Sequence, residues 1–364
     1  LCSPYIALNY NWVVFCLNRM LQGFAQGFHF PCVNAHIAQW APSPEKNRIF
    51  TFVFLGAQFG IMVTMLVAGY LAASPWGWPS IFYCTGLCGV LWSMVWLFVG
   101  ADSPDSHPSI SDHERKYIKS SLINNSENSS SMSTPWKAVA TSVPMWALIC
   151  CHFCHNWGYY TIATMLPSYV SKVLHFDIKN NGVISSIPFL TKCILSGVFS
   201  VIGDVILEKQ ILSLNVAKKI WTTIAMWGGA VAFVGLTLTS DSTTAVVMLT
   251  ITVSTGAAIY TGFLSNHLDL APNFAGFLMG ITNCFANLPA MCAPMAAGFI
   301  VTDQENKDQW MILFYISAAL FFMGNLFFIV FGSTNVQPWN NIKPLRKASY
   351  SKDNELMVSN KHCH

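Results

Sequence analysis

Two cationic side chains lie inside long apolar stretches of this sequence. Arg19 is about seven residues into the stretch 11–36, and Lys192 is about ten residues into the stretch 182–206. A charged group in hydrocarbon costs several kcal/mol, so each cation must face protein or a water-filled cavity. A guanidinium matches carboxylate and phosphate through two parallel hydrogen bonds. Arg19 therefore predicts an anion site, with a carboxylate partner on a neighbouring helix as the alternative.

Two glutamines extend the polar character of the first stretch. Gln26 follows Arg19 by seven residues, and Gln22 lies between them. Seven residues are close to two helical turns, so Arg19 and Gln26 share one helix face. A polar stripe on an otherwise apolar helix predicts the lining of a cavity. For Lys192, substrate contact and packing both remain open.

A short Cys/His segment offers a different chemistry. The run Cys151-His152-Phe153-Cys154-His155 matches the C-x-x-C-H pattern of c-type haem attachment and has metal-ligand residue types. It lies inside an apolar stretch, so we expect no haem, no metal and no other cofactor. His155 could instead line a pathway or carry a proton. The chain has no nucleophile motif and no phosphate-binding glycine loop, so it is not predicted to be an enzyme.

The composition identifies the environment of these residues. Of 364 residues, 53% are hydrophobic and 10% are charged, whereas soluble domains carry about 25% charged residues. The mean hydropathy is +0.46. This composition excludes a disordered chain, a coiled coil and a nucleic-acid-binding protein as descriptions of the whole chain. The lipid bilayer is the expected partner.

Membrane spans follow from apolar stretches of about 20 residues, the length that crosses ~30 Å of hydrocarbon. Residues 1–8 resemble the end of a further span, so we expect that an N-terminal part is missing. The fold class is therefore all-α, a polytopic membrane protein, expected to be a monomer. The complete spans are predicted at 11–36, 49–73, 78–100, 143–170, 182–206, 217–239, 242–264, 274–301 and 310–332.

Loop charges predict the orientation of these spans, because cytoplasmic loops are enriched in Lys and Arg. Three cations lie in the opposite set of loops, at Lys172, Lys179 and Lys307, and two lie inside spans. The other fourteen lie in one set of alternate loops and in the tail, which we predict to be cytoplasmic: Lys46, Arg48, Arg115, Lys116, Lys119, Lys137, Lys209, Lys218, Lys219, Lys343, Arg346, Lys347, Lys352 and Lys361.

The spans divide into two groups separated by a polar segment. We predict an N-terminal transmembrane part at 1–100, a flexible cytoplasmic linker at 101–141, a C-terminal transmembrane half at 142–333 and a disordered tail at 334–364. Three spans contain Gly-x-x-x-Gly, which favours close helix packing. These pairs are Gly23/Gly27, Gly56/Gly60 and Gly276/Gly280.

Several segments resemble one known family, the anion:cation symporters of the major facilitator superfamily. This family contains sialin, the type I sodium–phosphate cotransporters and the vesicular glutamate transporters, and the resemblance is strongest to its insect inorganic phosphate cotransporters. It covers about residues 1–340, and its most specific stretch is NHLDLAPNFAG at 266–276. Further matching segments are RMLQGFAQGFHFP at 19–31, WAPSPEKNR at 40–48, GWPSIFY at 77–83, NWGYY at 156–160 and LPSY at 166–169.

The resemblance implies a twelve-helix fold with alternating access, of which the first two to three helices would be missing here. It implies a secondary transporter of small inorganic or organic anions. Arg19 matches the family arginine that contacts the anion, and Gln58 matches a polar position on the next span. Tyr160 and Asn283 become cavity residues by the same carry-over. Together with Gln26 and Lys192 they form the predicted substrate site, and His155 and Asn266 are predicted pathway residues.

One position departs from the family pattern. Proton-coupled members have a glutamate seven residues after the arginine, and this chain has Gln26, whose amide does not titrate. We therefore expect sodium coupling, potential-driven transport or a proton carried by a carboxylate in the missing spans, so the coupling ion, Na⁺ or H⁺, is left open. A transport-inactive sensor or scaffold is the alternative function. The expected location is the plasma membrane or a lysosomal or vesicle membrane.

Overall fold

The computed structural model describes residues 1–341 except 28, 43–45, 127–134, 240 and 272–273, and these residues are almost entirely helical. No strand occurs among them, which confirms the predicted all-α class. The helices are α1 (Cys2–Asn9), α2 (Trp12–Gly27), α3 (His29–Trp40), α4 (Lys46–Ala72), α5 (Pro79–Val99), α6 (Asp112–Ser126), α7 (Trp136–Ala140), α8 (Val143–Lys172), α9 (Ile178–Glu208), α10 (Leu214–Leu238), α11 (Ser242–Thr255), α12 (Asn266–Leu270), α13 (Ala275–Ile300) and α14 (Lys307–Phe331).

Within the described residues, seven helical segments are long and apolar enough to cross a membrane. They coincide with seven of the nine predicted spans, that is, with all except 11–36 and 143–170. The two sets of bounds agree closely. The helix α8 occupies 143–170, and its polar residues His152, His155 and Asn156 explain why it is less apolar. The predicted span 11–36 is occupied by α2 and α3, on either side of residue 28.

The predicted span 242–264 does not form one continuous α-helix. The helix α11 ends at Thr255 and the chain continues as the 3₁₀ helices Gly256–Ile259 and Phe263–Ser265. A 3₁₀ helix is tighter than an α-helix and commonly marks a functional bend. The first 3₁₀ helix begins at Gly256, which lies against the buried side chain of Lys192.

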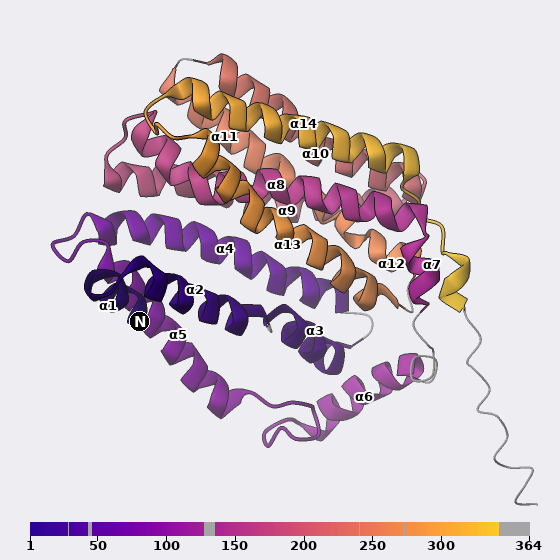
Figure 1. Ribbon diagram of the computed structural model, residues 1–364. Helices are drawn as coiled ribbons and strands as arrows, with labels where there is room; N and C mark the ends of the chain where they lie inside the picture. The colour runs from indigo at the N-terminus through magenta and orange to yellow at the C-terminus, as the bar shows by residue number, and fades with distance from the viewer. Residues whose placement is uncertain (28, 43–45, 127–134, 240, 272–273, 342–364) are drawn as a thin grey trace, which may run out of the picture.

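Two groups of helices lie side by side (Figure 1). The helices α1 to α5 form one group and α8 to α14 form the other, and α4 packs along α9 between them. The main cluster of buried hydrophobic residues begins at Val139 and lies in the second group, where α8 packs against both α13 and α14.

The predicted flexible linker contains helices, which corrects the prediction for residues 112–126 and 136–140. The hydroxyl of Ser111 accepts a hydrogen bond from the backbone N–H of Glu114 at 3.2 Å, and Asp112 and Glu114 are acidic residues in the first turn of α6. This is one half of a capping box, and it stabilises the start of a helix. The Ser/Asn-rich part at 127–134 lies outside the described residues.

The start of the predicted disordered tail is ordered. Residues Pro338–Asn341 form a 3₁₀ turn, and the N–H of Gln337 donates to the carbonyl of Leu270 at 2.8 Å. The ring of Trp339 lies 6.4 Å from that of Phe274. The prediction of disorder is therefore wrong for 334–341, because these contacts to α12 and its neighbour do not register in local composition. Residues 342–364 lie outside the described chain.

Glycine-mediated packing occurs, but not at the predicted pairs. A Cβ added at any of the six Gly-x-x-x-Gly positions would meet no described atom within 4 Å. Close approach occurs instead at Gly158, Gly182 and Gly324, where an added Cβ would lie 2.3, 2.7 and 2.6 Å from the nearest atom. Local spacing does not reveal which face of a helix meets a neighbour, and among the described residues these six glycines meet none.

Candidate substrate site

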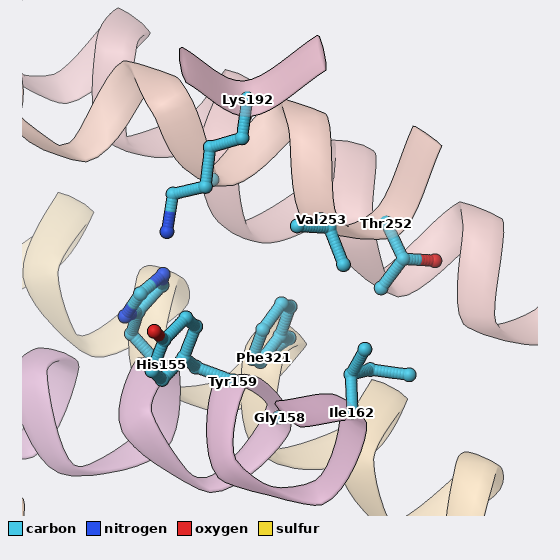
Figure 2. Close-up of a pocket in the computed structure, with 9 residues that line it drawn as sticks. His155, Gly158, Tyr159, Ile162, Lys192, Thr252, Val253 and Phe321 are labelled. Atoms are coloured by element: carbon cyan, nitrogen blue, oxygen red, sulfur yellow. The ribbon is translucent and has the colours of Figure 1, made fainter. Parts of the chain in front are cut away.

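Lys192 is the most deeply buried cation in the described part of the chain, with 2% of its surface exposed. It lies in the middle of α9, and its side chain extends toward α8 (Figure 2). The ammonium nitrogen lies 4.6 Å from the ring centroid of Tyr159, which is a cation–π contact. The ion pairs present among the described residues are Arg115–Asp112, Lys119–Asp105 and Lys218–Asp269, and none involves Lys192.

Aromatic rings surround the end of the Lys192 side chain. His155 and Tyr159 are four residues apart on α8 and therefore share a face, with ring centroids 6.4 Å apart. The imidazole also stacks on Phe321 of α14, at 5.8 Å between centroids. His155 is 4% exposed. The helix α8 thus places His155 in the interior beside Lys192, and its pathway role stays a prediction.

A small cavity separates these groups. It has a volume of about 20 Å³ and is lined by residues of α8, α9, α11 and α14 together with Gly256. A Cβ at Gly256 would lie 3.6 Å from Nε2 of His155 and 3.8 Å from Nζ of Lys192, so the glycine leaves space between the two nitrogen-bearing groups. A cavity of this size holds about one water molecule. An anion of several atoms would need the surrounding helices to move apart.

Gln58 brings the other group of helices into contact with this cluster. It lies on α4, is 9% exposed, and interacts with the hydroxyls of Tyr159 and Tyr260. Its Oε1 atom is buried and has no hydrogen-bond partner in the described structure. A buried amide oxygen without a donor is energetically unfavourable and suits a site that another polar group completes.

Arg19 lies outside this cluster. Its side chain is exposed on α2, and Nη1 donates a hydrogen bond to Oε1 of Gln22 at 3.2 Å. The guanidinium also lies over the rings of Phe15 and Phe82, at 5.1 and 5.2 Å from their centroids. Gln26 is exposed on the same helix. The polar face predicted from spacing is therefore present, but no contact joins Arg19 to Lys192 in the described structure.

Tyr160 and Asn283 lie along the contact between α8 and α13. The hydroxyl of Tyr160 is 3.5 Å from Oδ1 of Asn287, whose amide nitrogen donates to the carbonyl of Asn283 at 2.8 Å. The amide of Asn156 donates to the carbonyl of Ala286 at 2.8 Å. These polar contacts join two helices, and Tyr160 also packs edge-on against Tyr159 of the Lys192 cluster, with ring centroids 5.4 Å apart.

Asn266 holds the end of the transmembrane region in place. It is fully buried at the start of α12, and its amide donates to the carbonyl of Ser333 at 3.1 Å. Lys218 of α10 contacts the same segment. It donates a hydrogen bond to the hydroxyl of Ser265 and forms an ion pair with Asp269, with Nζ 3.5 Å from Oδ2. The described contacts are thus those of a structural residue, and the pathway role of Asn266 stays a prediction.

Sequence reasoning missed three residues of the cluster: Tyr159, Gly256 and Tyr260. The spacing of four residues between His155 and Tyr159 was a usable signal, because it places both on one helix face. The glycine at 256 gives no local sign that Lys192 lies opposite. As for the Cys/His segment, Cys151 and Cys154 are buried free thiols, and the described residues contain no group of three or more ligands arranged to hold a metal ion.

Comparison with known proteins identifies the family. The model of the Major Facilitator Superfamily matches residues 1–294. A "Putative inorganic phosphate cotransporter" of Drosophila ananassae is 40% identical over 331 residues, covering 90% of this chain and 68% of the relative. Sialin of Homo sapiens is 35% identical, covering 88% of this chain and 64% of the relative. Vesicular glutamate transporter 2 of Bos taurus is 33% identical, covering 91% of this chain and 57% of the relative.

Solved structures agree on the fold. A bacterial homologue of the human lysosomal transporter Spinster, in an inward-facing and unoccupied conformation, has a TM-score of 0.57 at 12% identity, covering 92% of this chain and 82% of that chain. This likeness concerns the fold alone. The chain spans between 57% and 68% of the length of the three relatives named above. The helices, the family model and the relatives together show that this chain is an integral membrane protein of the Major Facilitator Superfamily, in its anion:cation symporter group.

Proposed function

We propose that the protein is a secondary transporter that moves a small anion across the membrane by alternating access. The family is one of transporters, and the names of two relatives specify phosphate and glutamate, both of which are anions. The observation that carries the proposal is Lys192, a buried cation with no carboxylate partner among the described residues. A cation held in this way attracts an anion strongly, because the surrounding dielectric constant is low.

The anion would bind between the two groups of helices. Lys192 and Tyr159 would contribute from α9 and α8, and Gln58 would contribute from α4. The cavity of about 20 Å³ is too small for phosphate or a carboxylic acid, so binding requires α4 to move relative to α9. A site shared between two bodies that move against each other is suited to alternating access.

Arg19 is proposed as a second anion-binding cation. Its guanidinium is exposed, and its hydrogen bond to Gln22 engages only one of its nitrogen atoms. The remaining donors suit two oxygens of one carboxylate or phosphate. Because Arg19 and Lys192 do not touch, we propose that they act at different depths of the same route.

The proposal is tested by uptake of radiolabelled phosphate and glutamate into liposomes that contain the full-length protein. Arg19→Ala and Lys192→Met should each lower uptake by roughly tenfold or more, as loss of a charged contact predicts. Lys219→Met, which removes a partly exposed lysine near the start of α10, is the matched control and should leave uptake unchanged. Each variant is first checked for membrane insertion.

Two results would contradict the proposal. Uptake that survives both substitutions at the wild-type level would remove these cations from the anion site. A wild-type protein that binds phosphate or glutamate without moving either would favour the transport-inactive sensor or scaffold instead. Repeating uptake at several pH values, with and without sodium, identifies the coupling ion. Sodium-independent acid activation that disappears in Gln26→Ala would contradict the expectation that position 26 carries no proton.

A further inference from the structure

The buried ammonium of Lys192 presents an energetic problem that the proposed function does not solve. The residue is 2% exposed near the middle of a predicted span, where a charged lysine is unfavourable by several kcal/mol. The cation–π contact with Tyr159 returns about 0.5–2 kcal/mol, which is less than that cost. Burial therefore destabilises the ammonium of the empty site relative to a lysine in water.

Among the described residues, no carboxylate forms an ion pair with Lys192. The titratable groups around Lys192 are His155 and Tyr159 on α8, Tyr260 after the 3₁₀ helix and Cys193 on α9 itself. The helix α4 contributes the neutral amide of Gln58 to the same cluster, and α11 contributes Thr252 and Val253 to the cavity wall. Neither α10 nor any other described element places a carboxylate against Lys192.

We propose that Lys192 carries the coupling proton, as an ammonium when the anion is bound and as an amine when the site is empty. This inference rests on the proposed function and deepens it. When the anion enters, a hydronium ion of the solution gives its proton to the lone pair of Nζ and leaves as water, and the anion supplies the balancing negative charge. When the anion leaves on the other side, the N–H bond breaks and the proton returns to water. One proton and one anion cross together, and Lys192 returns to its starting form.

Two features of the structure favour this assignment. The cavity of about 20 Å³ beside Lys192 has room for about one water molecule, which can relay the proton between Nζ and the solution. Figure 2 shows the side chains that line it. Gln26 cannot carry a proton, so a proton-coupled mechanism needs another titratable group. Coupling at Lys192 is also reciprocal by thermodynamic necessity: the anion raises proton affinity by the factor by which the proton raises anion affinity.

The test measures protons taken up when phosphate or glutamate is added to the purified full-length protein in weak buffer with a pH indicator. The wild type should take up protons when the anion binds, beyond the titration of the anion itself, and this uptake should grow toward one proton per anion as the pH rises above neutral. Lys192→Arg keeps the positive charge but does not release its proton, since arginine stays protonated. It should bind the anion with no proton uptake and should transport with no pH dependence. Lys192→Met should take up no proton and bind roughly tenfold more weakly or worse.

Lys219→Met is the control and should behave like the wild type in both proton uptake and binding. If Lys192→Met does not fold, as judged by its thermal unfolding, Lys192→Arg alone decides. Wild-type proton uptake in Lys192→Arg would overturn the inference and leave the proposed function intact. A wild-type protein that binds neither phosphate nor glutamate would overturn the proposed function and this inference with it.

Discussion

The two groups of helices differ in how their apolar surfaces are covered. In α10 of the second group, 56% of the most apolar window is buried inside the molecule, whereas in α5 of the first group 0% is buried. The helix α2, which carries Arg19, has no buried residue. The second group therefore builds its own core around Lys192, and the first group depends on other surroundings, among them lipid. The contacts of Lys192 can therefore be described because helices enclose it, whereas Arg19 lies on a helix with no buried residue.

The largest expected effect tests the contact between the two groups. A Cβ at Gly182 of α9 would lie 2.7 Å from the Cα of Gly69 on α4 and 3.0 Å from the carbonyl oxygen of Met65. Backbone atoms cannot move aside as a side chain can, so Gly182→Val should force the helices apart. We expect a loss of uptake of roughly a hundredfold, measured in liposomes after checking insertion.

Gly197 provides the control for that substitution. It lies on the same helix, and an added Cβ would meet no described atom within 4 Å. Gly197→Val should therefore transport at close to the wild-type rate. Equal losses in the two variants would show that valine disturbs α9 itself and would remove the Gly69–Gly182 contact from the mechanism.

The second prediction concerns the ion pair between Lys218 and Asp269 at one end of the second group of helices. Lys218→Met removes the partner of Asp269 and should lower the free energy of unfolding by about 2–3 kcal/mol. Burial raises the pKa of Asp269, and the Lys218 ammonium opposes this increase. Without the lysine the pKa of Asp269 rises further, so the folded state binds a proton more tightly than the unfolded state.

The sign of the pH dependence follows from that shift. Stability of Lys218→Met should fall as the pH rises through the pKa of Asp269, and the deficit against the wild type should shrink in acid, where the carboxyl is neutral. Thermal unfolding midpoints at acidic and neutral pH, compared with Lys219→Met, measure this. A deficit that does not change with pH would mean that Asp269 is not the affected group.

The third prediction compares a glycine from each group. Gly158→Ala places a Cβ 2.3 Å from the ring of Phe321, and overpacking of this kind costs about 1–2 kcal/mol. Gly23→Ala on α2 would meet no described atom within 4 Å and should be neutral or stabilising by up to about 1 kcal/mol, because alanine favours helix. Thermal unfolding of both variants checks the difference. A larger loss at Gly23 would contradict the described packing of the first group.

The smallest expected effect lies in the cavity. Gly256→Ala would place a methyl group at ordinary contact distance from His155 and Lys192, 3.6 and 3.8 Å away, so the fold should tolerate it. The methyl would occupy space beside the Lys192 ammonium and should weaken anion binding about three- to tenfold. Binding titrations with phosphate and glutamate measure this, with Gly197→Ala as the control. Unchanged affinity would place the anion away from Gly256.

Much of the fold could be predicted because hydropathy is a local property. The spans, the helical class and the family came from runs of apolar residues and from segments such as 266–276. The predicted site residues do not lie together in the structure. Lys192, His155 and Gln58 meet in one cluster, whereas Arg19 and Gln26 lie on an exposed face and Asn266 lies in a buried structural contact.

The sequence by itself determined that this protein resides in a membrane and that two cations lie inside its spans, because the cost of burying charge and backbone in lipid applies to each segment separately. Only the tertiary structure decided which of those cations is enclosed. Lys192 lies beside His155 and Gly256, and Gln58 joins them through Tyr159, so residues far apart in the chain come together by helix pairing. Helix pairing in a membrane is set by shape and close contact between distant surfaces, which no local pattern contains.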